Sequence, residues 1–239
     1  MISAIADILL LARLAALEYT TDAAPIADGV NALGLGFVGQ VGSDECQALI
    51  ADWGGRVVVC FRGTQVLENA SLPEIGDDLD THRLQGPGDV GFVHRGFWQP
   101  LAELWPRIVA LLPPGPSPIF TGHSLGGVRA HLAGAILPGE VVSFGAPKGA
   151  DAAFWAHAYP DSRPQPLRVI HEEDFAPGWS PFLPWSTQPP GDIGWLHSGR
   201  LYRVPTRTTW INESVPDHSV DRYVTALADL QDRSTRLAA

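Results

Sequence analysis

A Gly-x-Ser-x-Gly pattern centres on Ser124, with Gly122 and Gly126 two residues to either side. The apolar run Pro118–Thr121 predicts a strand before it, and the spacing of apolar residues from Leu125 to Leu137 predicts a helix after it. A serine at such a corner projects its hydroxyl beyond the sheet edge, while small neighbours relieve crowding and the helix N-terminus favours an anion. We therefore predict a nucleophilic serine, against the alternative of a glycine-rich turn with an incidental serine.

A nucleophilic serine needs a base and an acid that orients the base, and chains with this corner place them in the order serine, acid, histidine. Downstream of the serine, the strand-like pair Val169-Ile170 leads into an acidic cluster in which Asp174 is the best-placed carboxylate. Glu172 and Glu173 are poorer candidates. With His171 the cluster could suggest a metal site, but no second histidine pair stands at ligand spacing, so we expect no metal or other cofactor.

Two histidines follow the predicted acid, and either could be the base. His197 leads into the strand-like run Leu201–Val204, where a packed structural role is common. His218 stands at a loop-to-helix junction, with Asp217 as the expected N-cap of a C-terminal helix, so its ring can project into a site built from loops. We predict His218 as the base.

Further segments occur in the order found in class 3 lipases, the fungal-lipase-like branch of the α/β-hydrolases. The matching segments are 57–64 (Val-Val-Val-Cys-Phe-Arg-Gly-Thr), Asp78-Leu79, 93–97 (Val-His-Arg-Gly-Phe), 122–127, 143–147 (Ser-Phe-Gly-Ala-Pro), 168–177, and Asp217-His218 with Tyr223. This ordered set spans roughly positions 57 to 223 and is more specific than any single motif. The chain therefore resembles this family.

The resemblance implies that Ser124, Asp174 and His218 form a catalytic triad. It also implies an oxyanion hole made by the backbone N–H and hydroxyl of Thr64 together with the backbone N–H of Leu125.

Asp78 resembles the family carboxylate that holds the threonine hydroxyl, although it and its acidic neighbours Asp77 and Asp80 could instead form a solvated patch. Arg62 and His94 also fall in family motifs, and we expect both to be buried framework groups.

Two segments are candidates for substrate contact. Residues 65–77 depart from the family pattern and resemble a lid, with Val66 and Leu67 on its apolar face; an ordinary surface loop is the alternative. Residues 175–200 form a proline-rich, aromatic segment between the predicted acid and base, and we expect Trp179 and Trp185 to contact an acyl chain. These rings could instead form a satellite core under their own loop.

Length and composition predict one α/β domain over residues 1–239, with a mostly parallel sheet and helices on both faces. A turn at Gly54-Gly55 predicts an early antiparallel hairpin that pairs Cys60 with Leu49 rather than with Cys46, which leaves both thiols free. The N-terminal apolar stretch is too short and charged to span a bilayer and lacks signal-peptide features, so we expect a helix lying on the sheet. Cytoplasmic localisation is the default, with export lacking a recognisable signal as the alternative.

The formal net charge is −10 and no basic patch is present, so we expect no nucleic-acid partner and no obligate protein partner. An anionic membrane would repel the chain unless an apolar lid mediates transient contact with a lipid interface. We predict a serine hydrolase, a lipase or esterase that cleaves acylglycerols or related lipid esters through an acyl-enzyme. Phospholipase A1, feruloyl-type esterase and peptidase activities share this chemistry, and a non-catalytic lipase-like binding protein is the alternative from another class.

Overall fold

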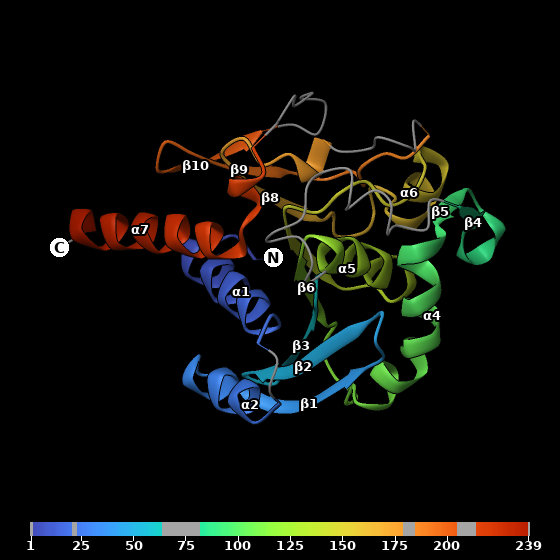
Figure 1. The fold of residues 1–239 in the computed structure, drawn as a ribbon, viewed down its shortest axis with the longest axis horizontal. Coiled ribbons are helices and arrows are strands. Elements are labelled where there is room, and N and C mark those ends of the chain that lie inside the picture. The colour runs from blue at the N-terminus through green and yellow to red at the C-terminus, as the bar shows by residue number, and fades with distance from the viewer. Residues whose placement is uncertain (1, 21–22, 64–81, 179–184, 205–213, 239) are drawn as a thin grey trace.

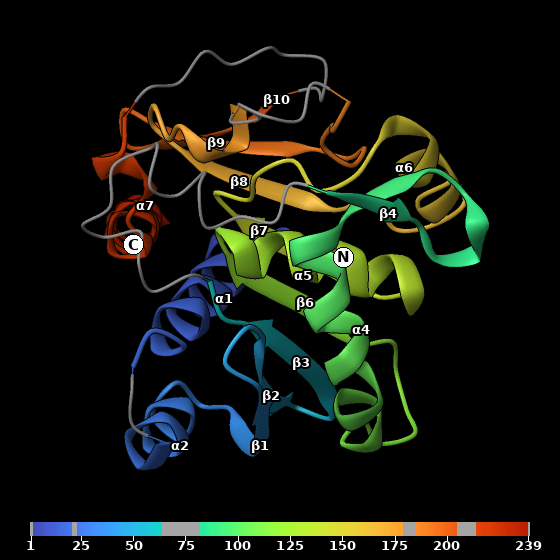
Figure 2. The ribbon, with the colours of Figure 1, turned by 45° about the vertical axis from the view of Figure 1, so that its right-hand side comes forward.

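An eight-stranded mixed sheet forms the centre of the protein, in the order β1-β2-β3-β6-β7-β8-β9-β10 (Figures 1 and 2). The computed structural model describes residues 2–20, 23–63, 82–178, 185–204 and 214–238. Five neighbouring strands, β3, β6, β7, β8 and β9, run parallel to one another. The remaining pairs, β1 with β2, β2 with β3 and β9 with β10, are antiparallel. The sheet strands are β1 (Gly36–Gly42), β2 (Gln47–Trp53), β3 (Arg56–Phe61), β6 (Ile119–His123), β7 (Glu140–Phe144), β8 (Leu167–His171), β9 (Ile193–His197) and β10 (Arg200–Val204).

Helices cover both faces of this sheet, as the sequence predicts (Figure 1). One face carries α4 (Arg95–Ala110), α5 (Leu125–Ile136) and α6 (Ala152–Ala158), and the other carries α1 (Ile5–Leu17), α2 (Ala23–Ala32) and α7 (Val220–Ala238). A separate two-stranded sheet pairs β4 (Arg83–Gln85) with β5 (Phe92–His94), and short 3-10 turns occur at η2 (Pro87–Asp89), η3 (Ala176–Gly178) and η4 (Pro216–His218).

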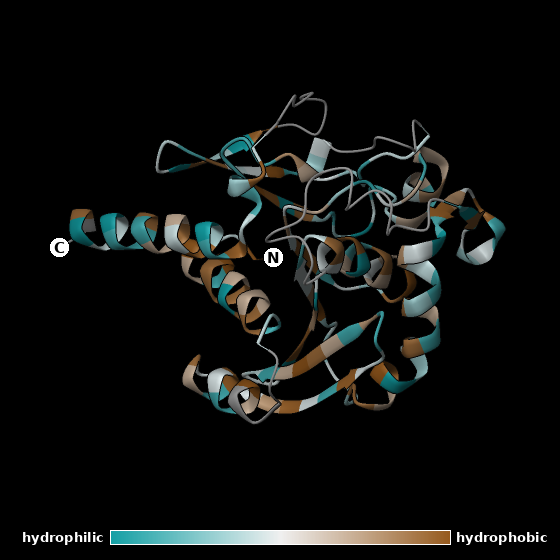
Figure 3. Cartoon of the chain, viewed as in Figure 1, coloured by the Kyte–Doolittle hydropathy of each residue, from teal (hydrophilic) through white to brown (hydrophobic). Residues whose placement is uncertain are grey.

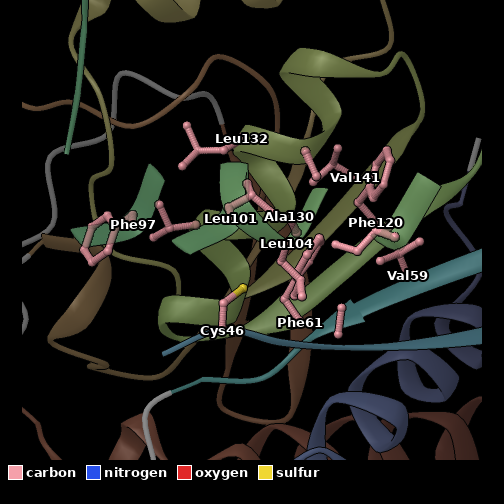
Figure 4. Packing of buried hydrophobic residues seen from close by; sticks show 14 of the residues in the cluster. Cys46, Val59, Phe61, Phe97, Leu101, Leu104, Phe120, Ala130, Leu132 and Val141 are labelled. Carbon is pink, nitrogen blue, oxygen red and sulfur yellow. The ribbon is translucent and has the colours of Figure 1, made fainter. Parts of the chain in front are cut away.

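Strand β3 shows how alternation divides the core into two clusters. Val57, Val59 and Phe61 pack toward α4 and α5, whereas Val58 and Cys60 pack toward α1 and α7. All five are buried, as expected for a central strand covered on both sides. Figure 4 shows the first cluster, which includes Phe61 of β3, Phe120 of β6 and Leu104 of α4.

Helix α5 differs from the one-sided helix that its spacing predicts. Every residue from Gly126 to Gly134 is buried, because the helix lies between the sheet and helices α4 and α6. The small residues of its sequence allow this close packing. Figure 3 shows how buried and one-sided elements differ in hydropathy. The mostly buried helix α1 and the central strands are largely brown (hydrophobic), whereas α7 alternates brown and teal.

The predicted hairpin is confirmed, because β2 and β3 are antiparallel and Leu49 pairs with Cys60. Cys46 and Cys60 are both free and buried. The predicted N-terminal helix is also confirmed, since α1 buries Ile8, Leu11 and Leu14 against the sheet and α7. None of the helices in the described ranges combines the length and apolar character needed to cross a membrane.

Candidate active site

Ser124 occupies a sharp corner between β6 and α5. Its φ of 56° and ψ of −126° lie in a region that side-chain-bearing residues rarely adopt. The corner is crowded: a Cβ atom on Gly122 would lie 2.5 Å from the backbone of Gly126, and one on Gly126 would overlap the carbonyl oxygen of Phe61. Glycine is therefore required at both positions, because the backbones of β3, β6 and α5 lie too close together there for a side chain.

The side chain of His218 connects Ser124 to Asp174. Its Nε2 lies 2.8 Å from the Ser124 hydroxyl oxygen, and its Nδ1 lies 2.9 and 3.0 Å from the two carboxylate oxygens of Asp174. The exposed fractions are 3% for Ser124, 5% for His218 and 0% for Asp174. With Nδ1–H donating to the carboxylate, Nε2 is left as the acceptor for the serine hydroxyl.

Three elements deliver these groups to one edge of the sheet. Ser124 follows β6, Asp174 follows β8, and His218 lies in the turn η4 before α7. Since β6 and β8 run parallel with β7 between them, their carboxyl ends meet at the same edge. The order of the three along the chain is the order that the sequence argument requires.

The buried carboxylate of Asp174 has further hydrogen-bond donors. The backbone N–H of Ala176 donates to Oδ1 at 2.9 Å, and the phenol of Tyr223 donates to Oδ2 at 2.5 Å. Tyr223 is fully buried, and burial, followed by the nearby carboxylate, raises the pKa of its phenol well above 10. The phenol therefore stays protonated and remains a donor.

Gly145 explains why the segment 143–147 matters for the site. Its φ is +56°, and a Cβ there would lie 2.5 Å from Asp174 Oδ2, 3.0 Å from the Tyr223 hydroxyl and 3.1 Å from His218 Nδ1. Only glycine leaves room for the acid, its phenol donor and the histidine at this point.

Two further side chains, which the sequence argument did not assign to the site, lie next to it: His123 contacts His218, and Tyr19 contacts His123. His123 Nε2 lies 2.6 Å from the backbone oxygen of His218, and His123 Nδ1 lies 2.7 Å from the hydroxyl of Tyr19. Tyr19 is 104 residues from His123 in the sequence, and no motif links the two. Only the position of His123 beside the serine could have suggested a role.

The remaining predicted site residues fall in different places. Leu125 is the first residue of α5 and half-buried, so its backbone N–H belongs to the unpaired first turn of the helix beside Ser124. Trp185 is half-buried in the segment before β9. Outside the described residues lie Thr64, Val66, Leu67, Asp78, its neighbours Asp77 and Asp80, Trp179 and the whole of the candidate lid, 65–77.

The alternatives for base and acid make other contacts. His197 ends β9, where its Nδ1 lies 2.6 Å from Glu172 and its ring stacks on Trp195 at 4.3 Å. Its side chain is 37% exposed, so it is not the packed residue that we expected. The backbone N–H of Glu173 lies 3.4 Å from the carboxylate of Asp217.

Asp217 was expected to be the N-cap of the last helix, and this prediction is wrong by two residues. Helix α7 begins at Val220, and Asp217 lies inside the preceding turn η4. Its carboxylate accepts a 2.7 Å hydrogen bond from Arg222 instead. The rest of this 3-10 turn, which carries His218, lies between Asp217 and the start of α7, so Asp217 cannot cap that helix.

The segment expected as one loop over 175–200 is interrupted, because its last part forms β9 and the start of the β9–β10 hairpin. Strand β9 is parallel to β8, and the carbonyl of Asp192 accepts a hydrogen bond from the backbone of Arg168 at the start of β8. The segment therefore begins at the serine edge of the sheet, reaches the opposite edge before β9, and returns along β9 to the serine edge.

The two framework predictions have different outcomes. His94 is buried, with 2% exposure, and stacks on Phe97 at 4.0 Å, as expected. Arg62 is only half-buried and lines a polar cavity of about 350 Å³ with Thr20, Gln40 and Gln47. No group of three or more histidine, cysteine or acidic residues in the described ranges could hold a metal ion.

A second serine–histidine pair lies in the core. His131 Nε2 is 2.8 Å from the Ser143 hydroxyl, and both residues are fully buried between α5 and β7. The Nδ1 of His131 has no hydrogen-bond partner among the described residues, so no acid orients this ring. Burial lowers the pKa of His131 to about 3. With neither an orienting carboxylate nor access for a substrate, this pair is suited to structure rather than chemistry.

Comparison with known proteins places this geometry in a wider context. The fold matches the triacylglyceride lipase of Rhizomucor miehei with a TM-score of 0.73 at 21% identity, covering 89% of this chain and 91% of that one. It matches the lipase of Rhizopus microsporus var. chinensis with a TM-score of 0.71 at 22% identity, covering 90% and 85% of the two chains. Lipase II from Rhizopus niveus matches with a TM-score of 0.71 at 19% identity, covering 90% and 92%.

These structural matches establish the α/β-hydrolase fold of the lipases, because identities this low carry the fold alone. The sequence model of the family described as Lipase (class 3) matches residues 58–183, which is more than half of the 239 residues. This segment contains the serine corner and the buried carboxylate. The chain therefore belongs to the class 3 lipase family.

Proposed function

We propose that the protein is a serine hydrolase of carboxylic esters, with Ser124 as nucleophile, His218 as base and Asp174 as the orienting acid. The observation that carries this proposal is the unbroken hydrogen-bonded chain from the Ser124 hydroxyl through both ring nitrogens of His218 to the buried carboxylate. Membership of the class 3 lipase family supports the same assignment.

The first half of the reaction transfers the acyl group to the enzyme. His218 Nε2 accepts the hydroxyl proton as the Ser124 oxygen attacks the ester carbonyl, and the carbonyl oxygen becomes an oxyanion. The backbone N–H of Leu125 is suited to stabilise that charge, with Thr64 as its proposed partner and Asp78 as the support of the threonine hydroxyl. The imidazolium then donates its proton to the departing alkoxide, and the acyl-enzyme remains.

Water completes the cycle. His218 accepts a proton from a water molecule as its oxygen attacks the acyl carbon, and then returns a proton to the Ser124 oxygen as the ester bond to the enzyme breaks. A carboxylic acid is released. While the ring is neutral, Asp174 keeps it in the tautomer with a free Nε2, and when the ring is protonated the buried negative charge of Asp174 stabilises the imidazolium.

We propose lipid esters of the acylglycerol kind as the substrate class, because the Rhizomucor miehei relative is a triacylglyceride lipase. Phospholipase A1 and feruloyl-type esterase activities use the same groups and are the alternatives within the reaction class. Val66, Leu67, Trp179 and Trp185 are the residues that we propose to contact the acyl chain.

A panel of p-nitrophenyl esters of increasing chain length, run beside a peptide anilide and a phospholipid, tests this function. We expect ester turnover, loss of turnover in Ser124→Ala, and labelling of Ser124 alone by an organophosphonate. Ser143→Ala is the matched control, since it removes the other histidine-bonded serine hydroxyl and should keep turnover per folded molecule. Absence of ester turnover, or substantial turnover by Ser124→Ala, would contradict the proposal.

The same assay separates this mechanism from a metal-assisted one. EDTA should leave the rate unchanged, because no step above requires a metal-activated water. Loss of activity on EDTA treatment, restored by a divalent ion, would instead implicate the acidic cluster around Asp174.

A further inference from the structure

The hydroxyl of Tyr19 lies where three segments of the proposed site meet. Tyr19 follows α1, and its oxygen is 2.7 Å from His123 Nδ1, beside the nucleophile. A Cβ on Gly63, which precedes the proposed oxyanion residue, would overlap the Tyr19 hydroxyl and lie 2.8 Å from the His123 carbonyl oxygen. The chain just after the N-terminal helix therefore reaches the serine corner through the side chain of Tyr19.

His123 continues this contact to the base. Its Nε2 lies 2.6 Å from the backbone oxygen of His218, and the two rings are 4.6 Å apart between centroids. The side chain of His123 is buried, with 4% exposure. Burial, and then the neighbouring His218, lower the pKa of His123 to about 3. The ring is therefore neutral at ordinary pH and adds no positive charge beside the imidazolium that forms on His218.

These contacts determine which ring nitrogen of His123 carries the proton. A neutral imidazole has one donor and one acceptor, and a backbone carbonyl can only accept. Nε2 must therefore carry the hydrogen that is donated to His218, which leaves Nδ1 to accept from the Tyr19 hydroxyl. Without that hydroxyl the opposite tautomer becomes accessible, and it would place a lone pair of Nε2 against the carbonyl oxygen.

We propose that Tyr19 and His123 are positioning residues that hold the main chain of His218, so that its ring meets Ser124 at hydrogen-bond distance. Asp174 controls the rotation of the ring through Nδ1, while His123 restrains the backbone from which the ring projects. The inference rests on the proposed function, because it concerns the same base. It adds a second restraint, made by the end of β6 and by the residue that follows the first helix.

Two substitutions at His123 distinguish its two hydrogen bonds. His123→Gln keeps a donor long enough to reach the His218 carbonyl, whereas His123→Asn keeps an acceptor near Nδ1 but is too short to reach that carbonyl. We expect kcat to fall about a hundredfold in His123→Asn, about tenfold in Tyr19→Phe and only a few-fold in His123→Gln, because small displacements of a base are costly. KM should change little.

The core pair of Tyr159 and His131 provides matched controls. Tyr159 is buried, whereas Tyr19 is half-buried, and the Tyr159 hydroxyl donates to the backbone oxygen of His131 at 2.5 Å. His131 is also a buried neutral ring. Tyr159→Phe and His131→Gln should lower stability while kcat for each correctly folded molecule remains that of the unsubstituted protein.

Active-site titration with an organophosphonate makes the outcome decisive. Dividing turnover by the number of labelled Ser124 side chains gives kcat per competent site, which a merely structural defect would not change. Equal kcat per labelled site in Tyr19→Phe, His123→Asn and the controls would overturn the positioning role. An unsubstituted protein that neither turns over esters nor becomes labelled would instead contradict the proposed function.

A measurement on the unsubstituted protein covers the case in which the variants do not fold. Nitrogen-15 NMR of the histidine rings should show His123 as the neutral Nε2–H tautomer from about pH 5 to pH 9, although a free ring would titrate near 6.5. A protonated His123, or the Nδ1–H tautomer, in that range would overturn the inference.

Discussion

Tyr223 and Asp174 form a fully buried donor–acceptor pair in which the phenol oxygen lies 2.5 Å from the carboxylate. A carboxylate removed from water needs donors for its lone pairs, and the phenol supplies one that cannot ionise at ordinary pH. The acid of the proposed triad therefore depends on the first turn of the last helix.

Tyr223→Phe should weaken both stability and catalysis. One lone pair of the buried carboxylate loses its donor, which costs about 1–3 kcal/mol of unfolding free energy. The looser carboxylate should lower kcat about tenfold, since it orients the His218 ring. Urea unfolding and ester turnover measure the two effects. Tyr202→Phe, on the exposed part of β10, is the control, and an equally small effect of both changes would show that the phenol is dispensable.

The two downstream histidines should differ sharply in turnover. His218→Ala removes the ring whose Nε2 lies at hydrogen-bond distance from the Ser124 hydroxyl and should lower kcat by roughly four orders of magnitude. His197→Ala breaks a partly exposed contact with Glu172 and should leave kcat close to that of the unsubstituted protein. The reverse pattern would show that the base was wrongly assigned.

Gly126→Ala should prevent the serine corner from forming correctly. The added methyl group would overlap the carbonyl of Phe61, and backbone atoms cannot move aside as a flexible side chain can. Gly115→Ala is the matched control, because a Cβ there meets nothing within 4 Å. We expect loss of turnover and a lower melting temperature only in Gly126→Ala. Similar melting temperatures and rates in both variants would contradict the packing described for the corner.

The stability of the protein should fall as the pH drops below about 6.5. Burial lowers the pKa of His123 and of His131 from 6.5 to about 3 in the folded protein. Between pH 3 and pH 6.5 the unfolded chain binds more protons at these two rings than the folded protein does. The contribution of these rings to the unfolding free energy therefore has its full value above pH 6.5 and decreases toward pH 3. Each ring contributes a slope of roughly 1.4 kcal/mol per pH unit.

Glu18 has the opposite effect on how the unfolding free energy depends on pH, so its contribution can be measured separately. Burial raises the pKa of its carboxyl from 4.5 to about 7, so the folded protein binds the extra proton. Its contribution is complete below pH 4.5 and is lost as the pH rises through 7. Urea unfolding at several pH values should show a shallower acid slope in His131→Asn and a smaller loss at alkaline pH in Glu18→Gln. Unchanged slopes in both variants would contradict this account.

Trp185→Ala tests whether the half-buried ring packs against the acyl chain of a substrate. If it does, kcat/KM should fall more for octanoate than for butyrate and acetate esters, by up to about 0.8 kcal/mol for each methylene group that the ring no longer covers. Trp195→Ala is the control, because that ring stacks on His197 of β9. Equal reductions for all three esters would place Trp185 in a structural cluster and leave the lid as the better candidate.

Local signals predicted the elements around the serine well. The strand and helix on either side of Ser124 begin and end within one or two residues of their predicted limits, because apolar spacing and the glycines act over a few residues. The pairing of Leu49 with Cys60 followed from one turn, since a hairpin determines its own register.

Contacts between residues far apart in the sequence could not be predicted from local sequence patterns. The contact between Tyr19 and His123 joins residues 104 positions apart, and its existence depends on α1 packing on the face behind β6. The displacement of Asp217 from the helix start arose because a 3-10 turn and an N-cap have similar sequences. The path from Asp174 to β9 depended on strand order, which short motifs do not encode.

The packing of α1 against α7 also has a consequence for when the protein becomes active. Tyr19 lies just after the first of these helices and His218 just before the second, so a growing chain carries Ser124 long before it carries its base. Joining the two helices closes a very long loop of chain, and contacts of such separation form late in folding. We therefore expect the proposed hydrolytic activity to appear only when α7 docks, because the base arrives with that helix.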